Sequence, residues 1–403
     1  MNYCRKMKAK FKRLPKKCRI SFCVISGLVV VWAVFLLGVN YGNGNISWSN
    51  GMSNGLPAQL NYSSVNQLYQ VLKANYDGTL TQTQLLNGIK HGLAQATNDP
   101  YTEYFTANEA KTFNSELNNS FSGIGAELSQ NSQGEIEVMS PLQGSPAIKA
   151  GLQPHDIIAA INNQSTSNMT VEQAVVLIRG KAGTTVTLTI VRGNNEFNVS
   201  IKRANITVPS VTYKILSGNL GYIAISTFAN DTAALIQKAA QDMVSHHVKG
   251  IILDLRNDPG GLVTAAVATT SEWLKPGQVI MQEKKGSQVL QTYYATGGDI
   301  LNGIPTVVLI NGGSASASEI TTGALHDHKD AYVMGTKSYG KGVVQQLINL
   351  SDGGQLKVTI ASWYRPNGKN INKIGITPDQ VVQPASNGSD NQLTAAESYL
   401  NSH

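Results

Sequence analysis

The sequence predicts an α/β protein with a smaller β-rich domain and a single membrane helix near its amino terminus. Three patterns lead to this prediction: an uncharged run over residues 20–39, strand-like segments with turns over 121–203, and alternating strands and helices from residue 220 onward. The chain has 403 residues, of which 41% are hydrophobic and 14% charged, so we expect two or three folded units.

Residues 1–19 form a basic head that we assign to the cytoplasm. They hold nine of the 32 Lys and Arg residues and none of the 25 acidic residues, which leaves 23 basic and 25 acidic residues in the remainder. Nucleic-acid binding needs a positive surface, so this balance argues against a nucleic-acid partner for the body of the chain.

Residues 20–39 carry no charge, and as a helix they are long enough to cross a bilayer. Because Lys and Arg collect on the cytoplasmic side of such helices, we expect a single-pass cell-membrane protein whose body is extracytoplasmic. A cleaved signal peptide is the alternative, but its apolar region is normally shorter and ends in an AxA-like site. The following NYGNGN contains only a weak match, so the pattern favours an uncleaved signal anchor.

All three cysteines, Cys4, Cys18 and Cys23, lie in the head or the predicted anchor. The body therefore has no cysteine for a disulfide, a zinc thiolate site or a cysteine nucleophile.

The body divides by composition and by the period of its apolar residues. Residues 40–58 are rich in Gly, Asn and Ser and predict a flexible linker, and apolar residues at helical spacing predict two amphipathic helices within 59–110. Residues 111–204 are β-rich, with one helix over 171–178. Residues 205–385 predict an α/β layer with buried parallel strands, and 386–403 a short polar tail.

A serine-rich turn, NGGSASASEI, follows the apolar strand IPTVVLI and begins a helix. Such a turn exposes a hydroxyl where the amino end of the helix directs free N–H groups at a developing negative charge. Ser314, Ser316 and Ser318 all compete for the role of nucleophile. Plain packing or helix capping is the alternative interpretation of this turn.

Lys341 lies between two glycines in the string GTKSYGKGVVQ, and Gln345 follows four residues later. Burial disfavours the charged form of lysine, so a buried amine can take a proton from a serine hydroxyl. A nearby amide such as that of Gln345 would hold the amine in place. A solvated lysine in a β-turn is the alternative.

The string GIILDLRNDPGGL predicts a buried strand that ends in a glycine turn. An N–H of Gly260 or Gly261, together with the N–H of Ala317, would form an oxyanion hole. The acidic and basic residues Asp254, Arg256 and Asp258 suggest either a metal or carboxylate site or a salt-bridged turn, and the absence of clustered His or Glu favours the salt-bridged turn. We expect no metal and no organic cofactor.

The histidines do not fit a Ser–His pair. His326 and His328 follow Ser316 by ten and twelve residues on the same predicted helix, which places them about 15 Å or more from its start. His246 and His247 end another predicted helix, where a cation suits the helix dipole.

These strings, together with GKNINKIGITPD downstream and DPYTEYF and FSGIGAEL upstream, resemble in their order the C-terminal processing peptidases, the tail-specific serine proteases of family S41. The resemblance covers roughly residues 62–382 and implies a ClpP/crotonase-like α/β protease core. It implies Ser316 as nucleophile, Lys341 as general base and Gln345 as the residue that orients the lysine, with Ala317 and a glycine of DPGG in the oxyanion hole.

The same resemblance identifies the β-rich domain as a PDZ domain inserted in this core. Its carboxylate-binding turn would consist of Gly123, Ile124, Gly125 and Ala126, although an ordinary glycine-bearing strand with a bulge explains that string equally well on its own. Arg179 would either dock on the protease core or be a plain surface arginine.

The resemblance thus implies a serine endopeptidase that binds protein or peptide substrates by their free C-termini and cleaves exported proteins near that end. A homodimer through helices near 65–95 and 393–400 is plausible by analogy. A catalytically silent PDZ scaffold, a crotonase-type acyl-CoA enzyme and a trypsin-like HtrA protease are the alternatives. The export anchor argues against the acyl-CoA enzyme, and the lack of a GNSGGP-type string argues against HtrA.

Overall fold

The computed structural model describes residues 56–402 except residues 58 and 387. The predicted head (1–19), anchor (20–39) and most of the linker (40–58) therefore lie outside the described residues. Within the described range, no helix combines the length and the apolar character needed to span a bilayer. The chain divides between Thr79 and Leu80 into two compact units.

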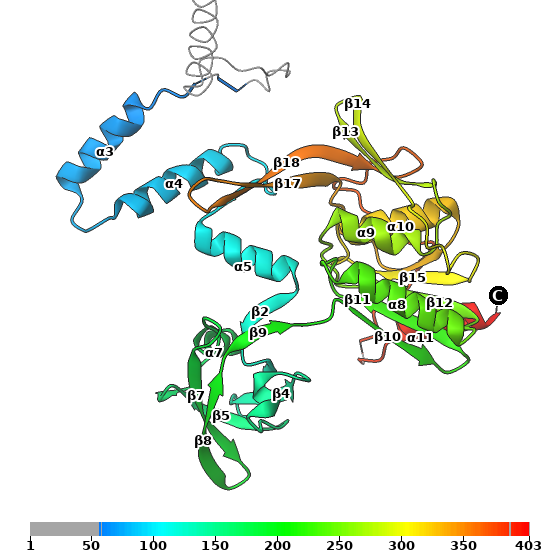
Figure 1. Ribbon diagram of the computed structural model, residues 1–403, viewed down its shortest axis with the longest axis horizontal. Helices are drawn as coiled ribbons and strands as arrows, with labels where there is room; N and C mark the ends of the chain where they lie inside the picture. Colours follow the sequence, from blue (N-terminus) through cyan, green and yellow to red (C-terminus); the bar gives the residue numbers. More distant parts are fainter. Residues whose placement is uncertain (1–55, 58, 387, 403) are drawn as a thin grey trace, which may run out of the picture. The chain divides into compact units, whose positions relative to one another are not determined.

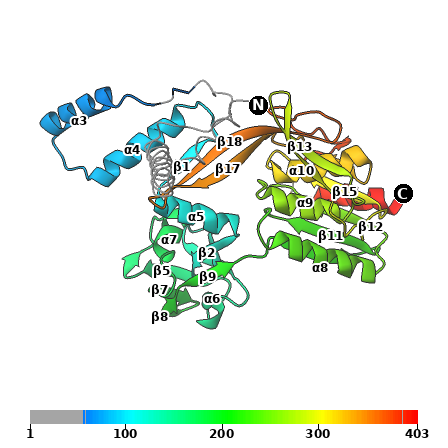
Figure 2. The same cartoon turned by 45° about the horizontal axis from the view of Figure 1, so that its top comes forward.

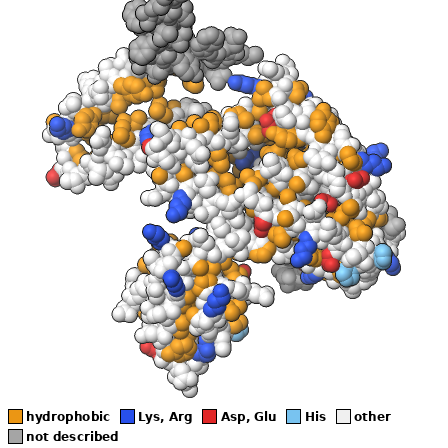
Figure 3. Space-filling model, in the orientation of Figure 1, with side chains coloured by type: hydrophobic (Ala, Val, Ile, Leu, Met, Phe, Trp, Pro, Cys, Tyr) orange, Lys and Arg blue, Asp and Glu red, His pale blue; other side chains and the backbone are white. Residues whose placement is uncertain are grey.

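The predicted amphipathic helices are α3 (Ser63–Asn75) and α4 (Gln82–Gln95). Helix α4 begins with a capping box in which Thr81 and Gln84 bond to each other's backbone. Each helix exposes large apolar side chains, visible as orange patches in Figure 3. These include Leu68, Tyr69 and Val71 on α3, and Leu86, Ile89 and Leu93 on α4.

An antiparallel sheet with two short helices forms the β-rich domain. Its strand order is β3-β4-β5-β7-β8, with β6 beside β5. The elements are β3 (Ala126–Gln130), β4 (Ile136–Pro141), α6 (Pro146–Lys149), β5 (Ile157–Ile161), β6 (Gln164–Ser165), α7 (Val171–Ile178), β7 (Thr185–Arg192) and β8 (Asn195–Lys202). Alternate residues of β7, among them Val186, Leu188 and Ile190, are fully buried in its core, as the TTVTLTIVR alternation predicts.

Helix α5 (Ala107–Leu117) and a two-stranded ribbon flank this domain in the sequence. The ribbon pairs β2 (Ser120–Gly123) with β9 (Ala204–Thr207). The chain therefore enters and leaves the β-rich domain through neighbouring strands (Figure 1).

A six-stranded sheet forms the α/β layer, in the order β10-β11-β12-β15-β16-β19. The strands are β10 (Val211–Leu216), β11 (Leu220–Ile225), β12 (Gly250–Asp254), β15 (Thr306–Ile310), β16 (Tyr332–Gly335) and β19 (Gln380–Val381). All pairs from β11 to β19 are parallel, and β10 joins antiparallel. Every residue of β12 and β15 is buried, which confirms the prediction of buried parallel strands.

Helices cover both faces of this sheet. Ile251 and Leu253 of β12 pack into the core cluster that contains α8 (Thr232–Ser245), α9 (Val263–Ser271) and α10 (Ala317–His328), whereas Ile252 packs with α11 (Asn391–Ser402). Figure 2 shows α11 at the end of the chain, beside this sheet. The segment that the sequence indicates as a polar tail thus buries Ala396 and Leu400 against the core.

A second sheet, which the sequence analysis does not predict, completes the core. It has the order β1-β18-β13-β14, with β17 paired to β18. Its strands are β1 (Glu103–Phe105), β13 (Val279–Lys285), β14 (Gln288–Tyr294), β17 (Val343–Asn349) and β18 (Gln355–Tyr364). The pairing of β1 with β18 brings the segment around residue 101 beside the segment around residue 341.

Candidate active site

Ser316 lies at the turn between strand β15 and helix α10, as the N-cap of the helix. Its backbone has φ 53° and ψ −112°, a conformation that non-glycine residues rarely adopt. Such strain is maintained only where the surrounding structure enforces it, and it is common at reactive positions. The turn presents this serine at the positive end of the helix dipole.

The three serines of SASAS differ in their surroundings. Ser314 Oγ donates to Leu255 O at 2.7 Å, and Ser318 Oγ donates to Asp258 O at 2.9 Å, so both fully buried hydroxyls are engaged with the backbone. Ser316 is half-buried and lines a cavity. Of the three, Ser316 is the one whose position suits a nucleophile.

Two glycines of the DPGG turn allow the backbone to pass close to Ser316. Gly260 has φ 96°, and a Cβ atom there would lie 2.8 Å from both Ser316 Cβ and Ala317 N. Gly261 has φ 144°, and a Cβ atom would lie 2.2 Å from Phe228 O. Any side chain at either position would displace the turn.

The N–H groups of this turn are not equivalent. Gly260 N–H donates to Asp258 Oδ1 at 2.8 Å, so it is occupied in this structure. The N–H groups of Gly261 and Ala317 have no acceptor among the described residues. Of the predicted oxyanion groups, those of Gly261 and Ala317 are therefore free to bind a ligand oxygen.

Lys341 lines the same cavity as Ser316 and, like Ser316, is half-buried. Within the described chain its Nζ atom has no ion-pair partner, and no hydrogen bond joins it to Ser316. Burial lowers the pKa of Lys341, and the charge of Lys357 lowers it further, while Glu319 and Asp99 act in the opposite direction. The net effect favours a neutral amine.

The glycines on either side of Lys341 meet a neighbouring loop. A Cβ atom on Gly340 would lie 2.8 Å from Gly375 N, and one on Gly342 would lie 2.5 Å from Asn372 N. The strings GKG and NINKIGI thus form a backbone-to-backbone contact that fixes the lysine loop.

Gln345 is on strand β17 and lines the cavity with Lys341. Its Nε2 atom donates to Thr359 Oγ1 at 3.2 Å on the paired strand β18. This bond fixes the amide group and leaves the Oε1 atom to accept a hydrogen bond.

The cavity has a volume of about 620 Å³ and is mostly apolar. Glu283, Tyr293 and Lys357 add polar groups to its wall. Its apolar lining consists of Phe113, Leu117, Leu262, Val263, Ile320, Val343, Val344, Leu347, Ile360 and Trp363. A cavity of this size and composition accommodates apolar side chains of an extended peptide.

Glu319, which the sequence analysis did not single out, joins the serine turn to the lysine loop. Its Oε2 atom accepts the N–H of Ser316 and of Lys341, each at 2.9 Å. Its Oε1 atom accepts the N–H of Gly340 at 2.7 Å and the hydroxyl of Ser338 at 2.5 Å. The spacing of Ser316 and Glu319 is that of a capping box, which is the signal that would have identified this residue.

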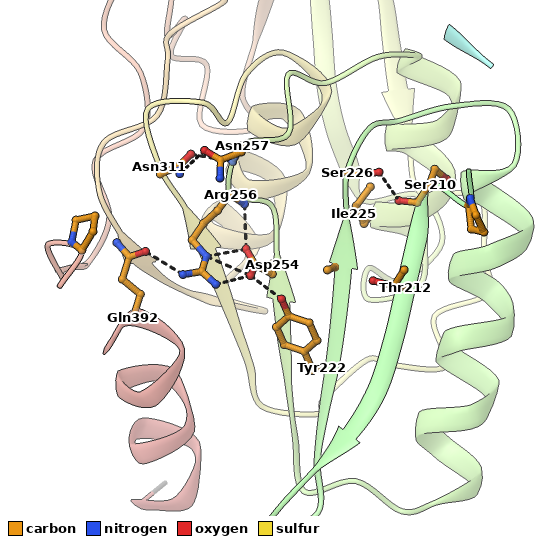
Figure 4. A pocket seen from close by; sticks show the side chains of 13 residues that line it. Ser210, Thr212, Tyr222, Ile225, Ser226, Asp254, Arg256, Asn257, Asn311 and Gln392 are labelled. Atoms are coloured by element: carbon orange, nitrogen blue, oxygen red, sulfur yellow. Dashed lines mark hydrogen bonds and ion pairs between the residues drawn. The ribbon is translucent and has the colours of Figure 1, made fainter. Parts of the chain in front are cut away.

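The DLRND segment forms the predicted salt-bridged turn. Arg256 pairs with Asp254 at 2.6 Å and with Asp390 at 2.8 Å. Figure 4 shows this turn on the wall of a second cavity of about 490 Å³, where Arg256 also reaches Gln392. Burial, together with the charge of Asp254, raises the pKa of Tyr222, which donates to Asp254.

Asp258 does not take part in this ion-pair network. Its side chain is fully buried, and its Oδ2 atom has no hydrogen-bond partner among the described residues. Burial raises its pKa to about 7. A carboxyl group at the DPGG turn therefore has a pKa well above the ordinary value for Asp.

His326 and His328 bind to residues outside the cavity, as their position far along α10 predicts. His326 contacts Asp379 at 2.9 Å, and His328 contacts Val279 O at 2.7 Å. His246 is the C-cap of α8, where its ring contacts Asp242 O at 2.8 Å.

The predicted carboxylate-binding turn lies between β2 and β3. Gly125 has φ 75°, and a Cβ atom there would lie 2.5 Å from Ser145 Cβ, so the turn requires glycine at this position. Ile124 is buried in the domain core, and Ala126 packs partly against it. Arg179 lies beside this turn, with its guanidinium 5.3 Å from the centre of the Phe121 ring.

Comparisons with known proteins agree with this architecture. A model described as "Peptidase family S41" matches residues 219–382, and one described as "PDZ domain" matches residues 114–191. A "Probable CtpA-like serine protease" of Staphylococcus aureus (strain MRSA252) is 36% identical over 377 residues, which cover 92% of this chain and 74% of the relative. The protein of that name from Staphylococcus haemolyticus (strain JCSC1435) is 38% identical over 338 residues, which cover 83% of this chain and 67% of the relative.

Two solved structures are similar. A protein of Bacteroides fragilis NCTC 9343 assigned to the S41 proteases has a TM-score of 0.54 at 15% identity, over 87% of this chain and 98% of that one, and this likeness shows the fold. A photosystem II D1 C-terminal processing protease is 28% identical with a TM-score of 0.49, and the match covers 80% of this chain and 87% of that one.

The two family models and the relatives together define a serine protease that carries a PDZ domain. The chain belongs to peptidase family S41, the C-terminal processing peptidases. This membership excludes the acyl-CoA enzyme and the HtrA protease that the sequence left as alternatives.

Proposed function

We propose that Ser316 is the nucleophile of this protease and that Lys341 is its general base. The observation that carries the proposal is the shared cavity: both side chains line it, and burial lowers the pKa of Lys341 where no described acid pairs with its amine. A neutral amine of this kind activates a serine hydroxyl.

The proposed reaction proceeds in two halves. Ser316 Oγ bonds to the peptide carbonyl carbon while its proton moves to Lys341, and the N–H groups of Ala317 and Gly261 stabilise the resulting oxyanion. The C–N bond then breaks as Lys341 gives that proton to the leaving amine. Water, deprotonated by Lys341, cleaves the acyl-enzyme and restores Ser316. Gln345 would orient the amine through its free Oε1 atom.

Proteolysis by the full-length chain tests this proposal. With an unfolded protein as substrate, Ser316→Ala and Lys341→Ala should each reduce cleavage about 1,000-fold or more. Lys337→Ala is the matched control, because Lys337 is exposed and lies four residues before Lys341. Unchanged cleavage by Lys341→Ala would overturn the dyad. A wild-type chain that binds chain ends without cutting them would be the silent PDZ scaffold.

We propose further that the PDZ domain binds the substrate's terminal carboxylate through the turn of Gly123, Ile124, Gly125 and Ala126. The positive φ of Gly125 and the guanidinium of Arg179 beside this turn support the proposal. Peptides with an amidated C-terminus should then show a KM about tenfold higher than the free acids, with little change in kcat. Equal KM values would contradict carboxylate binding.

We also propose that residues 20–39 anchor the protease in the cell membrane with its body outside the cytoplasm. The nine basic residues before this uncharged run support that orientation. In intact cells, added protease should digest the body and leave the first 19 residues protected. A body that resists digestion would contradict the orientation. The homodimer stays a prediction.

A further inference from the structure

Tyr101 contacts the amine of Lys341, although the two residues are far apart in the sequence. The Lys341 Nζ atom lies 5.2 Å from the centre of the Tyr101 ring. Lys341 lines the catalytic cavity and Tyr101 does not, so the ring contacts the amine from outside the cavity. The role of Tyr101 is therefore connected to the base and not to direct contact with substrate.

Three interactions hold the Tyr101 backbone in this position. Asp99 Oδ1 accepts the N–H of Tyr101 at 3.1 Å, and Asp99 Oδ2 accepts the hydroxyl of Thr102 at 2.7 Å. Thr102 Oγ1 in turn accepts the N–H of Thr359 at 3.2 Å. The next residues form β1, which pairs with β18. The ring is thus carried on the same sheet that carries Gln345.

We propose that Tyr101 is a positioning residue for Lys341, whose ring closes one side of the amine against water. The inference rests on the proposed function, because it assumes that Lys341 is the base. It adds a role for the DPYTEYF segment, which lies outside the α/β layer.

The physical reason is solvation. An ammonium group is strongly hydrated, and the Tyr101 ring takes the place of water on one side of it. The ring also attracts the charged form, so the proposal requires the lost hydration to outweigh this attraction. The charged and titratable groups that act on Lys341 are Glu319 on α10, Asp99 before β1, Lys357 on β18 and the Tyr101 phenol. The phenol of Tyr339 bonds to that of Tyr101. Neither described acid pairs with the amine, so exclusion of water is the main factor that favours its neutral form.

The pH dependence of kcat/KM tests the proposal in the full-length chain. In Tyr101→Ala, water enters beside the amine, and the rise of activity with pH should move to higher pH. At a fixed pH below the midpoint we expect a loss of about three- to tenfold that disappears at high pH. Tyr101→Phe keeps the ring and should restore the wild-type profile.

A matched control separates this role from structural support. Tyr104 lies on β1, three residues after Tyr101, with the Lys90 amine 5.3 Å from the centre of its ring. Tyr104→Ala therefore loosens β1 without uncovering Lys341. Tyr104→Ala should leave the midpoint of the rise of kcat/KM with pH unchanged. Thermal unfolding identifies any variant that does not fold. If Tyr101→Ala does not fold, Tyr101→Thr replaces it, with the same expected shift.

The outcomes distinguish the two proposals. An unchanged midpoint in a folded Tyr101→Ala or Tyr101→Thr variant, or an equal shift in Tyr104→Ala, would overturn the role of Tyr101 and leave the dyad intact. Full activity of Lys341→Ala would overturn the dyad itself. Reductive methylation of Lys341 gives a readout that does not depend on cleavage. It is measured by mass spectrometry in the Ser316→Ala background, with and without the Tyr101 substitution. The pH at which Lys341 becomes reactive should also move to higher pH when Tyr101 is replaced.

Discussion

The carboxylate of Glu319 holds Lys341 by its backbone, with Oε2 accepting the Lys341 N–H at 2.9 Å. The same oxygen accepts the N–H of Ser316 at 2.9 Å. One side chain therefore fixes the backbone of the proposed nucleophile relative to that of the proposed base. Small displacements of reacting groups cost large factors in rate, so in the proposed mechanism this carboxylate would position the nucleophile and the base.

Glu319→Gln should separate positioning from charge. The amide group would face N–H donors, so the two loops should move apart and kcat at its maximum should fall about 10- to 100-fold. Because the Glu319 charge raises the pKa of Lys341, its loss should move the rise of activity to lower pH. A pH series of kcat and KM checks both effects. An unchanged kcat would contradict the positioning role.

Lys357→Met should move the pH profile in the opposite direction. The charge of Lys357 lowers the pKa of Lys341, so its removal should make the base neutral only at higher pH. Met keeps an apolar stem beside Phe105 and Phe113, which the lysine covers at 5.1 and 5.2 Å. Glu103→Gln, which removes the ion-pair partner of Lys357, is the control. A shift to lower pH in Lys357→Met would refute this assignment.

Asp258→Asn should change how stability depends on pH. The folded-state pKa of Asp258 is raised to about 7, whereas an unfolded Asp titrates near 3.9, so between these values the folded state binds the additional proton. The wild-type free energy of unfolding should therefore fall as pH rises from about 4 to 7. The free energy of unfolding of the variant does not fall in this way. By pH 8 it should therefore have risen, relative to that of wild type, by about 3 kcal/mol. Urea unfolding at pH 5 and pH 8 measures the difference, and equal effects at both would count against a buried titrating carboxyl.

Arg203→Met should destabilise the PDZ domain. Arg203 is 8% exposed, and its guanidinium donates to the carbonyl oxygens of Leu177, Ile178 and Thr185 and to the hydroxyl of Thr184. Two of these carbonyls end helix α7, so the loss leaves helix acceptors without donors and should cost about 2–4 kcal/mol. Urea unfolding checks this, with the exposed neighbour Lys202→Met as control. Equal stability of the two variants would refute the capping role.

The predictable parts of the fold are those with local signals. The helix over 171–178 has its own start signal, a capping box from Thr170 to Gln173, and strands β12 and β15 are continuous apolar runs. Strand β17 ends in a run of exposed residues, and β18 is mostly partly buried, so neither strand has a clear period-two pattern. The pairing of β18 with β1 depends on a register that no local pattern specifies. The second sheet was missed for this reason.

The same distinction holds for the site. Ser316, Lys341 and Gln345 stand in recognisable strings, whereas the contact of Tyr101 with Lys341 arises only through the pairing of β1 with β18. Gly260 shows a different limit of prediction from sequence. The turn requires glycine at this position, but the Gly260 N–H already donates a hydrogen bond to Asp258. A sequence shows which residues have the right chemistry, but not which of their hydrogen bonds are already made.

The rate at which a fluorophosphonate modifies Ser316 tests the central claim most directly, because it reports the nucleophile without requiring substrate recognition. Peptide mapping by mass spectrometry should find the label on Ser316, at a rate that rises with pH and falls about 100-fold or more in Lys341→Ala but not in Lys337→Ala. Labelling of another serine, or an equal rate in Lys341→Ala, would contradict the account.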